Sequence, residues 1–159
     1  MRNIVAGLRE IPTFAIALQN ISGAMEQDDS IWKRHQLRPT PCRRMVMECL
    51  DTSGRAMSER EIRLAVGEEF DRTTLYRNMI SLEENGFIHR IVVAQGVVKY
   101  AANPDNQPAQ RHAHFFCKHC GNVWCLRQAQ TFKVEIPLGF QVEEEEIVVR
   151  GLCRACQEA

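Results

Sequence analysis

Residues 71–86 have the sequence DRTTLYRNMISLEENG, which contains the signals of one complete helix. Asp71 can cap the first turn, because its side chain can accept from the free backbone N–H groups there. Apolar residues follow at helical spacing on one face, namely Leu75, Met79, Ile80 and Leu82. Asn85 and Gly86 can end the helix, since glycine readily takes the left-handed conformation after the last turn. The sequence therefore predicts a helix between these two signals.

Two further helices are predicted upstream. Ser58-Glu-Arg-Glu61 has the form of a capping box, in which the serine hydroxyl and the glutamate satisfy each other's backbone N–H groups. It opens a helix expected to bury Ile62, Ala65, Val66 and Phe70. Residues 42–50 form the other helix, with Pro41 acceptable near its start. Its apolar face would hold Met45, Val46, Cys49 and Leu50.

A β-hairpin is predicted downstream, because β-rich residues 87–93 and 97–100 flank Ala94-Gln-Gly96. Three helices followed by a hairpin is the element order of a winged helix-turn-helix, whose third helix enters the major groove of DNA. The exposed face of that helix would carry side chains that bind phosphates and base edges, which are Arg72, Thr73, Thr74, Tyr76, Arg77 and Asn78. On pattern alone, a small helical domain with a charged exposed face is the alternative.

The charge of the chain is unevenly distributed. It has 159 residues with 20 basic and 20 acidic side chains, but residues 31–100 hold 12 basic and 9 acidic ones. This asymmetry hints at a polyanionic partner on this half, and a solvated basic face is the simpler alternative. The hydrophobic content of 45% excludes disorder, and no apolar run approaches the about 18 residues of a membrane span. We expect a cytoplasmic protein without a membrane partner. Residues 1–30 form an expected tail, in which Met25 offers an alternative start of translation.

Two cysteine pairs point to a metal. Seven cysteines are an odd number, and in a reducing compartment metal binding is more common than disulfides. Cys117-x-x-Cys120 and Cys153-x-x-Cys156, separated by 32 residues, can supply four thiolates to one tetrahedral zinc. The alternative is two independent redox dithiols, although a thioredoxin-type motif needs a strand-to-helix context and only one copy. We predict a structural zinc site.

The predicted fold class is α+β. A winged-helix DNA-binding domain (residues 31–102) is followed by a polar, proline-containing linker (103–111) and a small α/β metal-binding dimerisation domain (112–159). Strands are expected at residues 122–126, 140–142 and 147–150. A sheet of this size is not stable by hydrophobic burial alone. We therefore expect zinc to clamp its ends and a dimer interface to cover its apolar face.

Three histidines and a further thiol lie near the junction of these domains. His112 and His114 fall on one side of an extended segment, Cys125 is not needed by the four-cysteine site, and His89 sits at the base of the wing. Surface or core histidines are the simpler interpretation. A second metal site formed by these four residues is the alternative hypothesis.

Several segments, in order between residues 33 and 157, form a specific combination: Leu37-Arg-Pro-Thr40 with Arg43, Thr74-Leu-Tyr76-Arg77, Leu82-Glu-Glu-Asn-Gly86-Phe, His112-x-His114-Phe-Phe-Cys117-x-x-Cys120-Gly-x-Val123, Gly139-Phe140 and Gly151-Leu-Cys153-x-x-Cys156. This combination resembles the ferric uptake regulator superfamily. The resemblance implies a homodimeric winged-helix repressor in which metal at a hinge site closes the wings onto a palindromic AT-rich operator. It also implies DNA contacts by Arg38 and Arg43, and by Tyr76 and Arg77.

Departures from the family pattern favour zinc. Iron- and peroxide-sensing members place a histidine where this chain has Arg55-Ala-Met57, and a carboxylate where it has Ala101. Their hinge carboxylate falls here on Cys125, and softer ligands select zinc over Fe²⁺ or Mn²⁺. Gly86-Phe-Ile-His89 repeats a motif of the zinc uptake regulators, the subgroup with the most similar pattern. The cysteine that this subgroup places near Ala101 is absent.

We therefore expect a zinc-responsive repressor with a structural zinc and a second zinc, or other divalent metal, at His89, His112, His114 and Cys125. The alternatives are a redox- or peroxide-responsive regulator, an iron- or manganese-responsive regulator, and a zinc-stabilised DNA-binding module without sensing. An enzyme is not expected. The sequence lacks the His-x-Glu and Pro-Cys-x-x-Cys pair of zinc deaminases and the His-Glu-x-x-His of metalloproteases.

Overall fold

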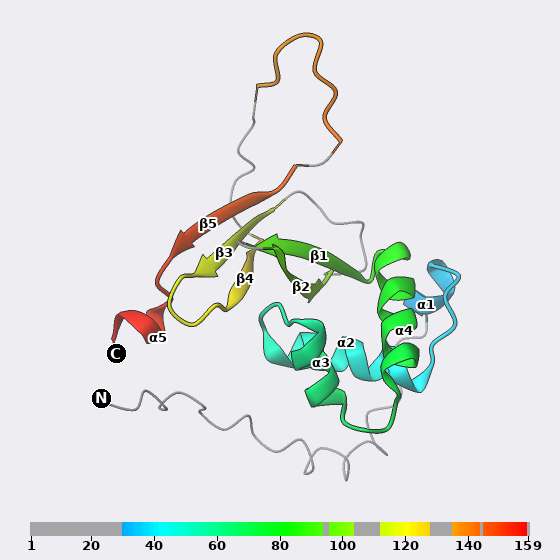
Figure 1. Cartoon of the computed structure of the whole chain (residues 1–159). Helices are drawn as coiled ribbons and strands as arrows, with labels where there is room; N and C mark the ends of the chain where they lie inside the picture. Colours follow the sequence, from blue (N-terminus) through cyan, green and yellow to red (C-terminus); the bar gives the residue numbers. More distant parts are fainter. Residues whose placement is uncertain (1–29, 94–95, 104–111, 128–134, 144, 159) are drawn as a thin grey trace.

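The computed structural model describes residues 30–93, 96–103, 112–127, 135–143 and 145–158. The predicted tail, apart from Ser30, and residues 104–111 of the predicted linker lie outside the described residues. Figure 1 shows helices at one end of the molecule, a hairpin packed beside them, and a second sheet beyond the hairpin. Within the described ranges, the longest helices are too short and too polar to cross a membrane.

The helices are α1 (Ser30–Arg34), α2 (Pro41–Ser53), α3 (Glu59–Val66) and α4 (Arg72–Glu84). Their caps are largely those that the sequence predicts. Ser58 and Glu61 form the capping box of α3, and the Asp71 carboxylate accepts from the first backbone N–H groups of α4 at 2.9 and 3.0 Å. The short α1 was not predicted. It places Trp32 on the ring of Phe87, with the ring centroids 4.4 Å apart.

The end of α4 is a Schellman motif, as its Asn-Gly sequence predicts. Gly86 has a φ of 74°. Its N–H donates to the Glu83 carbonyl at 3.0 Å, and the Phe87 N–H donates to the Leu82 carbonyl at 2.9 Å. These are the two hydrogen bonds that close a helix through a left-handed glycine. The helix therefore stops at a fixed point, and the chain turns directly into the wing.

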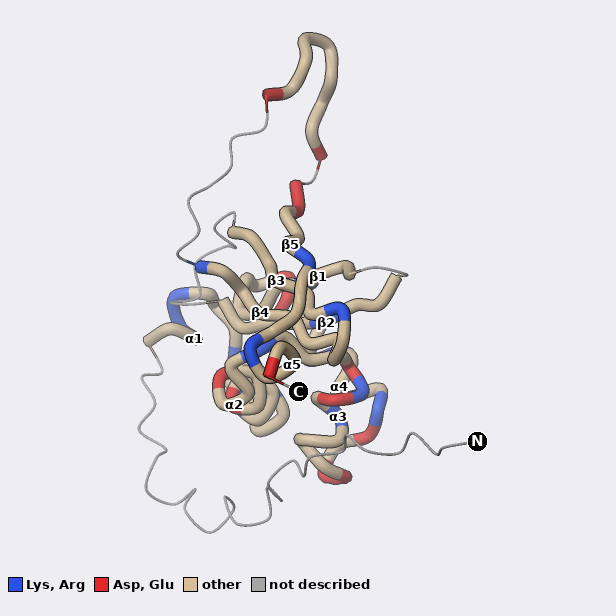
Figure 2. The backbone as a smooth tube through the Cα atoms, turned by 90° about the vertical axis from the view of Figure 1, so that its left-hand side faces the viewer, with Lys and Arg blue, Asp and Glu red and all other residues tan. Residues whose placement is uncertain are grey.

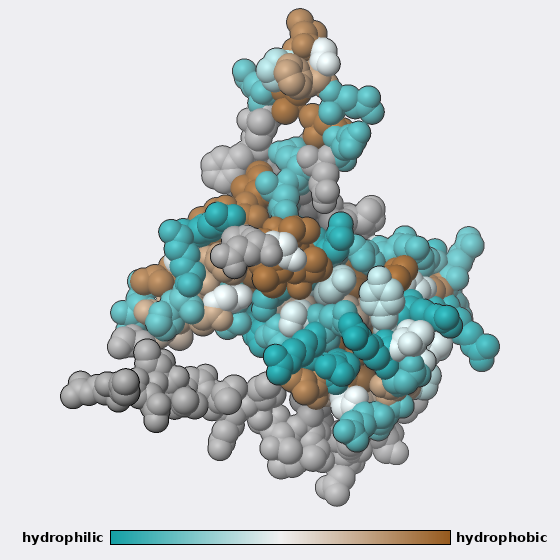
Figure 3. Space-filling view, in the orientation of Figure 1, coloured by the Kyte–Doolittle hydropathy of each residue, from teal (hydrophilic) through white to brown (hydrophobic). Residues whose placement is uncertain are grey.

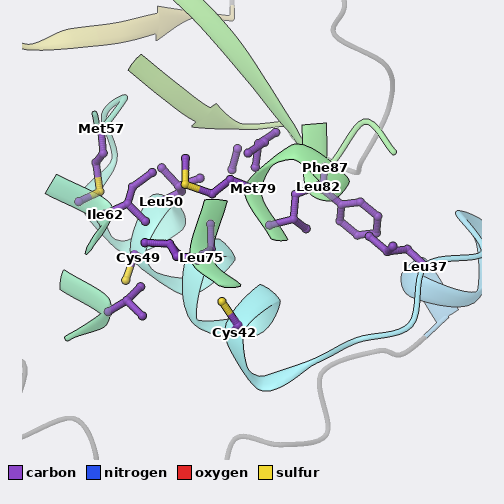
Figure 4. Packing of buried hydrophobic residues seen from close by; sticks show 14 of the residues in the cluster. Leu37, Cys42, Cys49, Leu50, Met57, Ile62, Leu75, Met79, Leu82 and Phe87 are labelled. Carbon is purple, nitrogen blue, oxygen red and sulfur yellow. The ribbon is translucent and has the colours of Figure 1, made fainter. Parts of the chain in front are cut away.

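The apolar core lies between α2, α3, α4 and the start of the wing (Figure 4). Ile62, Leu75 and Leu82 are almost fully buried there. One expectation for this region was wrong: Phe70 is not on the helix that it was assigned to. That helix ends at Val66, because Gly67 leaves the helical conformation with a φ of 81°. Phe70 follows in the loop and packs against the core from there, partly buried.

The wing consists of β1 (Ile88–Val93) and β2 (Val97–Ala102), paired antiparallel with His89 opposite Ala101. β2 runs past the predicted end at Tyr100. Ala101 and Ala102 extend the strand because they pair with His89 and Ile88 of β1. Met57 exchanges backbone hydrogen bonds with Tyr100, at 2.8 Å through its N–H and at 2.7 Å through its C=O. The segment after α2 thereby ties the wing to the helices.

The second sheet has the order β4-β3-β5. Its strands are β3 (Ala113–Cys117), β4 (Val123–Leu126) and β5 (Ile147–Gly151), and the short helix α5 (Arg154–Gln157) follows. β4 is antiparallel to β3 and β5 is parallel to it. The strand expected at residues 140–142 is not formed. Residues 135–143 instead project as an arm (Figure 1), and in the described chain they have no strand to pair with.

The winged helix and the second sheet touch through a small apolar cluster of Ala56, Ile91, Val93, Ala101 and Val123. The Ala56 N–H donates to the Val123 carbonyl at 2.8 Å, and the Arg127 guanidinium donates to the Ala102 carbonyl at 2.9 Å. The base of the wing is therefore fixed against β4. The residues expected to bind a second metal lie at this junction.

Candidate metal centres and DNA-binding face

Four thiols gather at one end of the second sheet. Cys117, at the end of β3, and Cys120, in the turn after it, meet Cys153 and Cys156 at the start of α5. The four Sγ atoms all lie within 4.8 Å of one another. The Sγ atoms of Cys120 and Cys153 are 3.8 Å apart, which is the separation that a tetrahedral centre with Zn–S bonds of about 2.3 Å requires. The predicted four-cysteine cluster is confirmed and fits a structural zinc.

Backbone N–H groups near this cluster favour the ionised form of one of its thiols. N–H groups of Cys120 and Cys153 point at the Cys117 sulfur, the latter at 3.3 Å, and lower the pKa of this thiol to about 6. A thiolate is the metal-binding form of cysteine. The pKa of Cys156 is raised to about 12, chiefly because its thiol is hydrogen-bonded to Cys153. The four cysteines are therefore linked by hydrogen bonds between their sulfur atoms. A metal bound by all four would displace the remaining thiol protons.

The second cluster joins the wing to the second sheet. His89 comes from β1, His114 from β3, Cys125 from β4, and His112 from the residue before β3. One ligand atom of each lies within 4.8 Å of the others. The Nε2 atom of His89 is 3.2 Å from Nε2 of His114 and 3.6 Å from Sγ of Cys125. A tetrahedral zinc with Zn–N of about 2.0–2.1 Å and Zn–S of about 2.3 Å needs separations close to these.

The state of these side chains fits a metal site. Burial lowers the pKa of His89 and of His114 to about 4, with the nearby His112 adding to the shift. Both imidazoles are therefore neutral at pH 7, which is the form that binds metal. In the described part of the chain, the buried Nδ1 of His114 has no hydrogen-bond partner. Burial raises the pKa of the Cys125 thiol to about 11, so metal binding there would release a proton.

A cavity adjoins one residue of this cluster. This cavity of about 280 Å³ between α2, β2 and β4 borders Cys125 and is lined in part by Asp51, Arg55 and Arg127. One residue of the site was missed by the sequence reasoning, which placed Asn103 in the linker. Asn103 is buried, and its Oδ1 lies 2.6 Å from Nδ1 of His89. Its sequence, Asn103-Pro-Asp, resembles an ordinary turn, so no local signal marks this role.

The residues predicted to contact DNA divide into two groups. Arg38, Thr73, Tyr76 and Arg77 are exposed. Arg43 and Thr74 are partly buried and engaged within the protein. The Arg43 guanidinium donates to the Arg38 carbonyl at 2.7 Å and to the Ser81 hydroxyl at 3.0 Å, while the Thr74 hydroxyl donates to Asp71 at 2.5 Å. Figure 2 shows basic and acidic positions interspersed along the backbone of α3 and α4.

The wing and the second sheet both contribute residues to the histidine–cysteine cluster, and the same sheet ends at the four-cysteine cluster. A winged helix joined to candidate metal sites in this way is typical of a metal-binding transcription regulator. The sequence profile of the ferric uptake regulator family matches residues 34–148. The chain belongs to this family. Members of the family are transcription regulators, and this agrees with the expectation that the chain is not an enzyme.

Individual relatives are distant. The chain is similar to the peroxide-responsive repressor PerR of Staphylococcus aureus, with 20% identity over 151 residues that cover 91% of this chain and 99% of PerR. Among solved structures, it is similar to a zinc uptake regulator complexed with zinc and DNA, with 23% identity, coverage of 94% and 97%, and a TM-score of 0.62. The Vibrio cholerae ferric uptake regulator has 19% identity, coverage of 79% and 98%, and a TM-score of 0.54. These similarities show the fold.

Proposed function

We propose that this metal-responsive regulator senses zinc and represses transcription in the cytoplasm by binding a palindromic AT-rich operator as a homodimer. The observation that carries the proposal is the convergence of His89, His112, His114 and Cys125 at the junction of wing and sheet. Nitrogen and sulfur ligands in a tetrahedral arrangement are typical of zinc. The four-cysteine cluster would hold a separate, structural zinc.

The surroundings of the second cluster also favour zinc over iron or manganese. Among the described residues, no carboxylate joins it. The positions where iron-sensing members carry further ligands hold Ala101 and Arg55-Ala-Met57. Ala101 and Met57 are buried apolar residues here, and Arg55 is a partly buried cation. Hard cations such as Mn²⁺ prefer oxygen ligands. A soft, oxygen-free ligand set therefore supports zinc as the sensed metal.

The position of the cluster supports a regulatory role. His89 belongs to the wing, whereas His114 and Cys125 belong to the second sheet. A metal bound to all of them would cross-link the DNA-binding half to the sheet. Since a ligand can shift a conformational equilibrium only by its preference for one state, a ten-fold effect on DNA affinity needs a preference of about 1.4 kcal/mol. Ligands drawn from both halves provide such a preference.

The projecting arm supports the dimer. Leu138 and Phe140 are 103% and 72% exposed, and Figure 3 shows apolar surface at the tip of the arm. Apolar side chains held this far from the protein body are typical of an interaction surface. Within the described residues, β5 also has an unpaired edge. A second copy of the chain would cover both, in agreement with the dimer interface predicted for this domain.

DNA binding with and without zinc tests the proposal. A random duplex pool would first be selected with the zinc-loaded protein, and the selected duplex then used to titrate wild type, His89→Ala, Cys125→Ala and the control His119→Ala. His119 is exposed and lies outside both clusters. We expect zinc to tighten binding by wild type and His119→Ala at least ten-fold, but not by the two cluster variants. Equal zinc dependence in all four proteins would contradict the proposal.

A further inference from the structure

Asn103 uses its side chain and its backbone to bind three groups around the end of β2. It is 6% exposed. Its backbone N–H donates to the Phe87 carbonyl at 2.8 Å, and its Nδ2 donates to the Gly86 carbonyl at 2.7 Å. Its Oδ1 lies 2.6 Å from Nδ1 of His89. A buried asparagine so completely bonded is held in one orientation.

These contacts determine which ring nitrogen of His89 carries the proton and which one is left unprotonated toward the cluster. A carbonyl can only accept, so the amide NH₂ of Asn103 must face Gly86, and its Oδ1 must face His89. An amide oxygen also only accepts, so Nδ1 of the neutral His89 carries the proton. Nε2 is then unprotonated and lies 3.2 Å from His114 Nε2 and 3.6 Å from Cys125 Sγ. Asn103 therefore holds His89 in its ligand form.

The other end of the Asn103 amide is attached to the predicted recognition helix. Gly86 is the left-handed residue of the Schellman motif that closes α4. The path from the cluster to this helix end consists of two hydrogen bonds, one from His89 to Asn103 and one from Asn103 to Gly86. All of these atoms belong to short, well-packed segments at the base of the wing.

We propose that Asn103 is a positioning residue which orients His89 for metal and couples occupancy of the cluster to the C-terminal end of α4. This inference rests on the proposed function, because it assigns a role at the same cluster. Coordination at Nε2 would make the Nδ1–H a stronger donor to Asn103, and a polarised amide donates more strongly in turn to Gly86. The end of α4 is therefore held more firmly in the metal-bound protein.

Two substitutions separate the two roles. Asn103→Ala removes both side-chain hydrogen bonds. Asn103→Asp keeps an acceptor for His89 but replaces the donor to Gly86 with a carboxylate oxygen. Asn85→Ala is the matched control, because the Asn85 side chain also bonds the end of α4, through the Ser81 carbonyl at 2.7 Å, and it is outside the metal cluster.

The experiment measures zinc affinity by chelator competition, and hydrogen exchange of residues 82–87 with and without zinc, on the full chain carrying its four-cysteine zinc. We expect Asn103→Ala to weaken binding of the second zinc 10–100-fold. Asn103→Asp should bind it more tightly than Asn103→Ala, because its carboxylate still accepts from Nδ1 of His89, but it should lose the zinc-induced slowing of exchange. Asn85→Ala should keep wild-type zinc affinity and the zinc-induced slowing.

Unchanged zinc affinity in Asn103→Ala, or zinc-induced slowing retained in Asn103→Asp, would overturn the inference alone. Uptake of a single zinc by wild type would overturn the proposed function and the inference with it. The ¹⁵N shifts of the His89 ring give an independent readout. They should show the Nδ1–H tautomer in wild type and Asn103→Asp, and a mixture of tautomers in Asn103→Ala.

Discussion

The ring of His89 faces the ring of His114 with their Nε2 atoms 3.2 Å apart, although the first belongs to the wing and the second to the neighbouring sheet. Both residues belong to one cluster with Cys125 and His112, in which one candidate ligand atom of each residue lies within 4.8 Å of the others. A metal there would join the two halves of the protein at the base of the wing.

Metal removal should occur in two steps. The junction cluster uses three imidazoles and one thiol, whereas the other cluster uses four thiols, which bind zinc more persistently as a closed structural site. We expect two zinc ions per chain, of which a mild chelator removes one without unfolding the protein. Elemental analysis before and after chelation, with circular dichroism at each step, measures this. Loss of both zinc ions in one step, accompanied by unfolding, would show that the two sites cannot be emptied separately.

Cys153→Ser should destabilise the second sheet. The Cys153 backbone N–H and thiol contact Cys117 and Cys120 respectively, and a small sheet depends on its metal for stability. We expect loss of one zinc and unfolding of β3, β4 and β5 in hydrogen exchange, with helices α2–α4 still protected. Cys49→Ser is the control, because Cys49 is buried in the helical core outside both clusters. It should leave the zinc content unchanged.

Glu61→Gln should destabilise the winged helix in a pH-dependent way. Burial opposes ionisation of Glu61, but hydrogen bonds from Ser58, Lys99 and Arg55 outweigh it and lower the pKa of the carboxyl to about 2. Its folded pKa is thus below the unfolded value near 4.5. The stabilisation is present above pH 4.5 and is lost as the pH falls toward 2.

We therefore expect Glu61→Gln to lower the free energy of unfolding by about 2 kcal/mol at pH 7, and by less than half as much near pH 2. Denaturant unfolding of both proteins at the two pH values gives this difference. Glu59→Gln is the control on the same helix, since its 3.4 Å pair with Arg72 is exposed and contributes little. An equal loss at both pH values would contradict the pairing of Glu61.

Phe87→Ala should lower the free energy of unfolding more than substitutions at exposed positions such as Leu64 and Leu138. Phe87 is 1% exposed and stacks on Trp32. Its removal leaves a cavity where α1, α4 and the wing meet, so we expect a loss of about 3–5 kcal/mol. Thermal denaturation measures it. A loss below about 1 kcal/mol, the size of a surface change, would show that this contact is not part of the core.

Leu138→Asp should weaken the dimer. Leu138 is fully exposed at the tip of the arm, and Leu64 on α3 is 64% exposed in the DNA-binding half. We expect Leu138→Asp to raise the dimer dissociation constant by at least about ten-fold, which corresponds to about 1.4 kcal/mol. Leu64→Asp should leave it unchanged. Sedimentation equilibrium measures the dissociation constant of each variant. Equal dissociation constants for Leu138→Asp and Leu64→Asp would exclude the arm from the interface.

The parts of the structure that the sequence predicts well are those with local signals. Ser58 and Asp71 cap their helices by bonds within three residues, and the spacing of the cysteines brings the four thiols together. The second cluster was found by combining scattered histidines with a family resemblance. Each cap and each Cys-x-x-Cys pair is present in a short segment of the chain, whereas the residues of the second cluster are brought together only by the fold.

The failures are nonlocal. Residues 140–142 have strand-like composition, but a strand needs a partner, and none pairs with them in the described chain. Asn103 resembles a turn residue, and only the fold places it between His89 and Gly86. Likewise, the sequence does not show that the Arg43 guanidinium donates to the Arg38 carbonyl and to the Ser81 hydroxyl, which is 38 positions away in the chain. The contact of Arg43 with DNA stays a prediction.

Zinc X-ray absorption of the chain with one and with two zinc ions identifies the ligands of each site. The one-zinc protein should show sulfur ligands alone at about 2.3 Å. The difference spectrum of the second zinc should show about three nitrogen ligands at 2.0–2.1 Å and one sulfur, and it should lose a nitrogen in His89→Ala and the sulfur in Cys125→Ala. A second zinc bound by oxygen, or one whose spectrum neither variant changes, would contradict the assignment of the junction cluster as the sensing site.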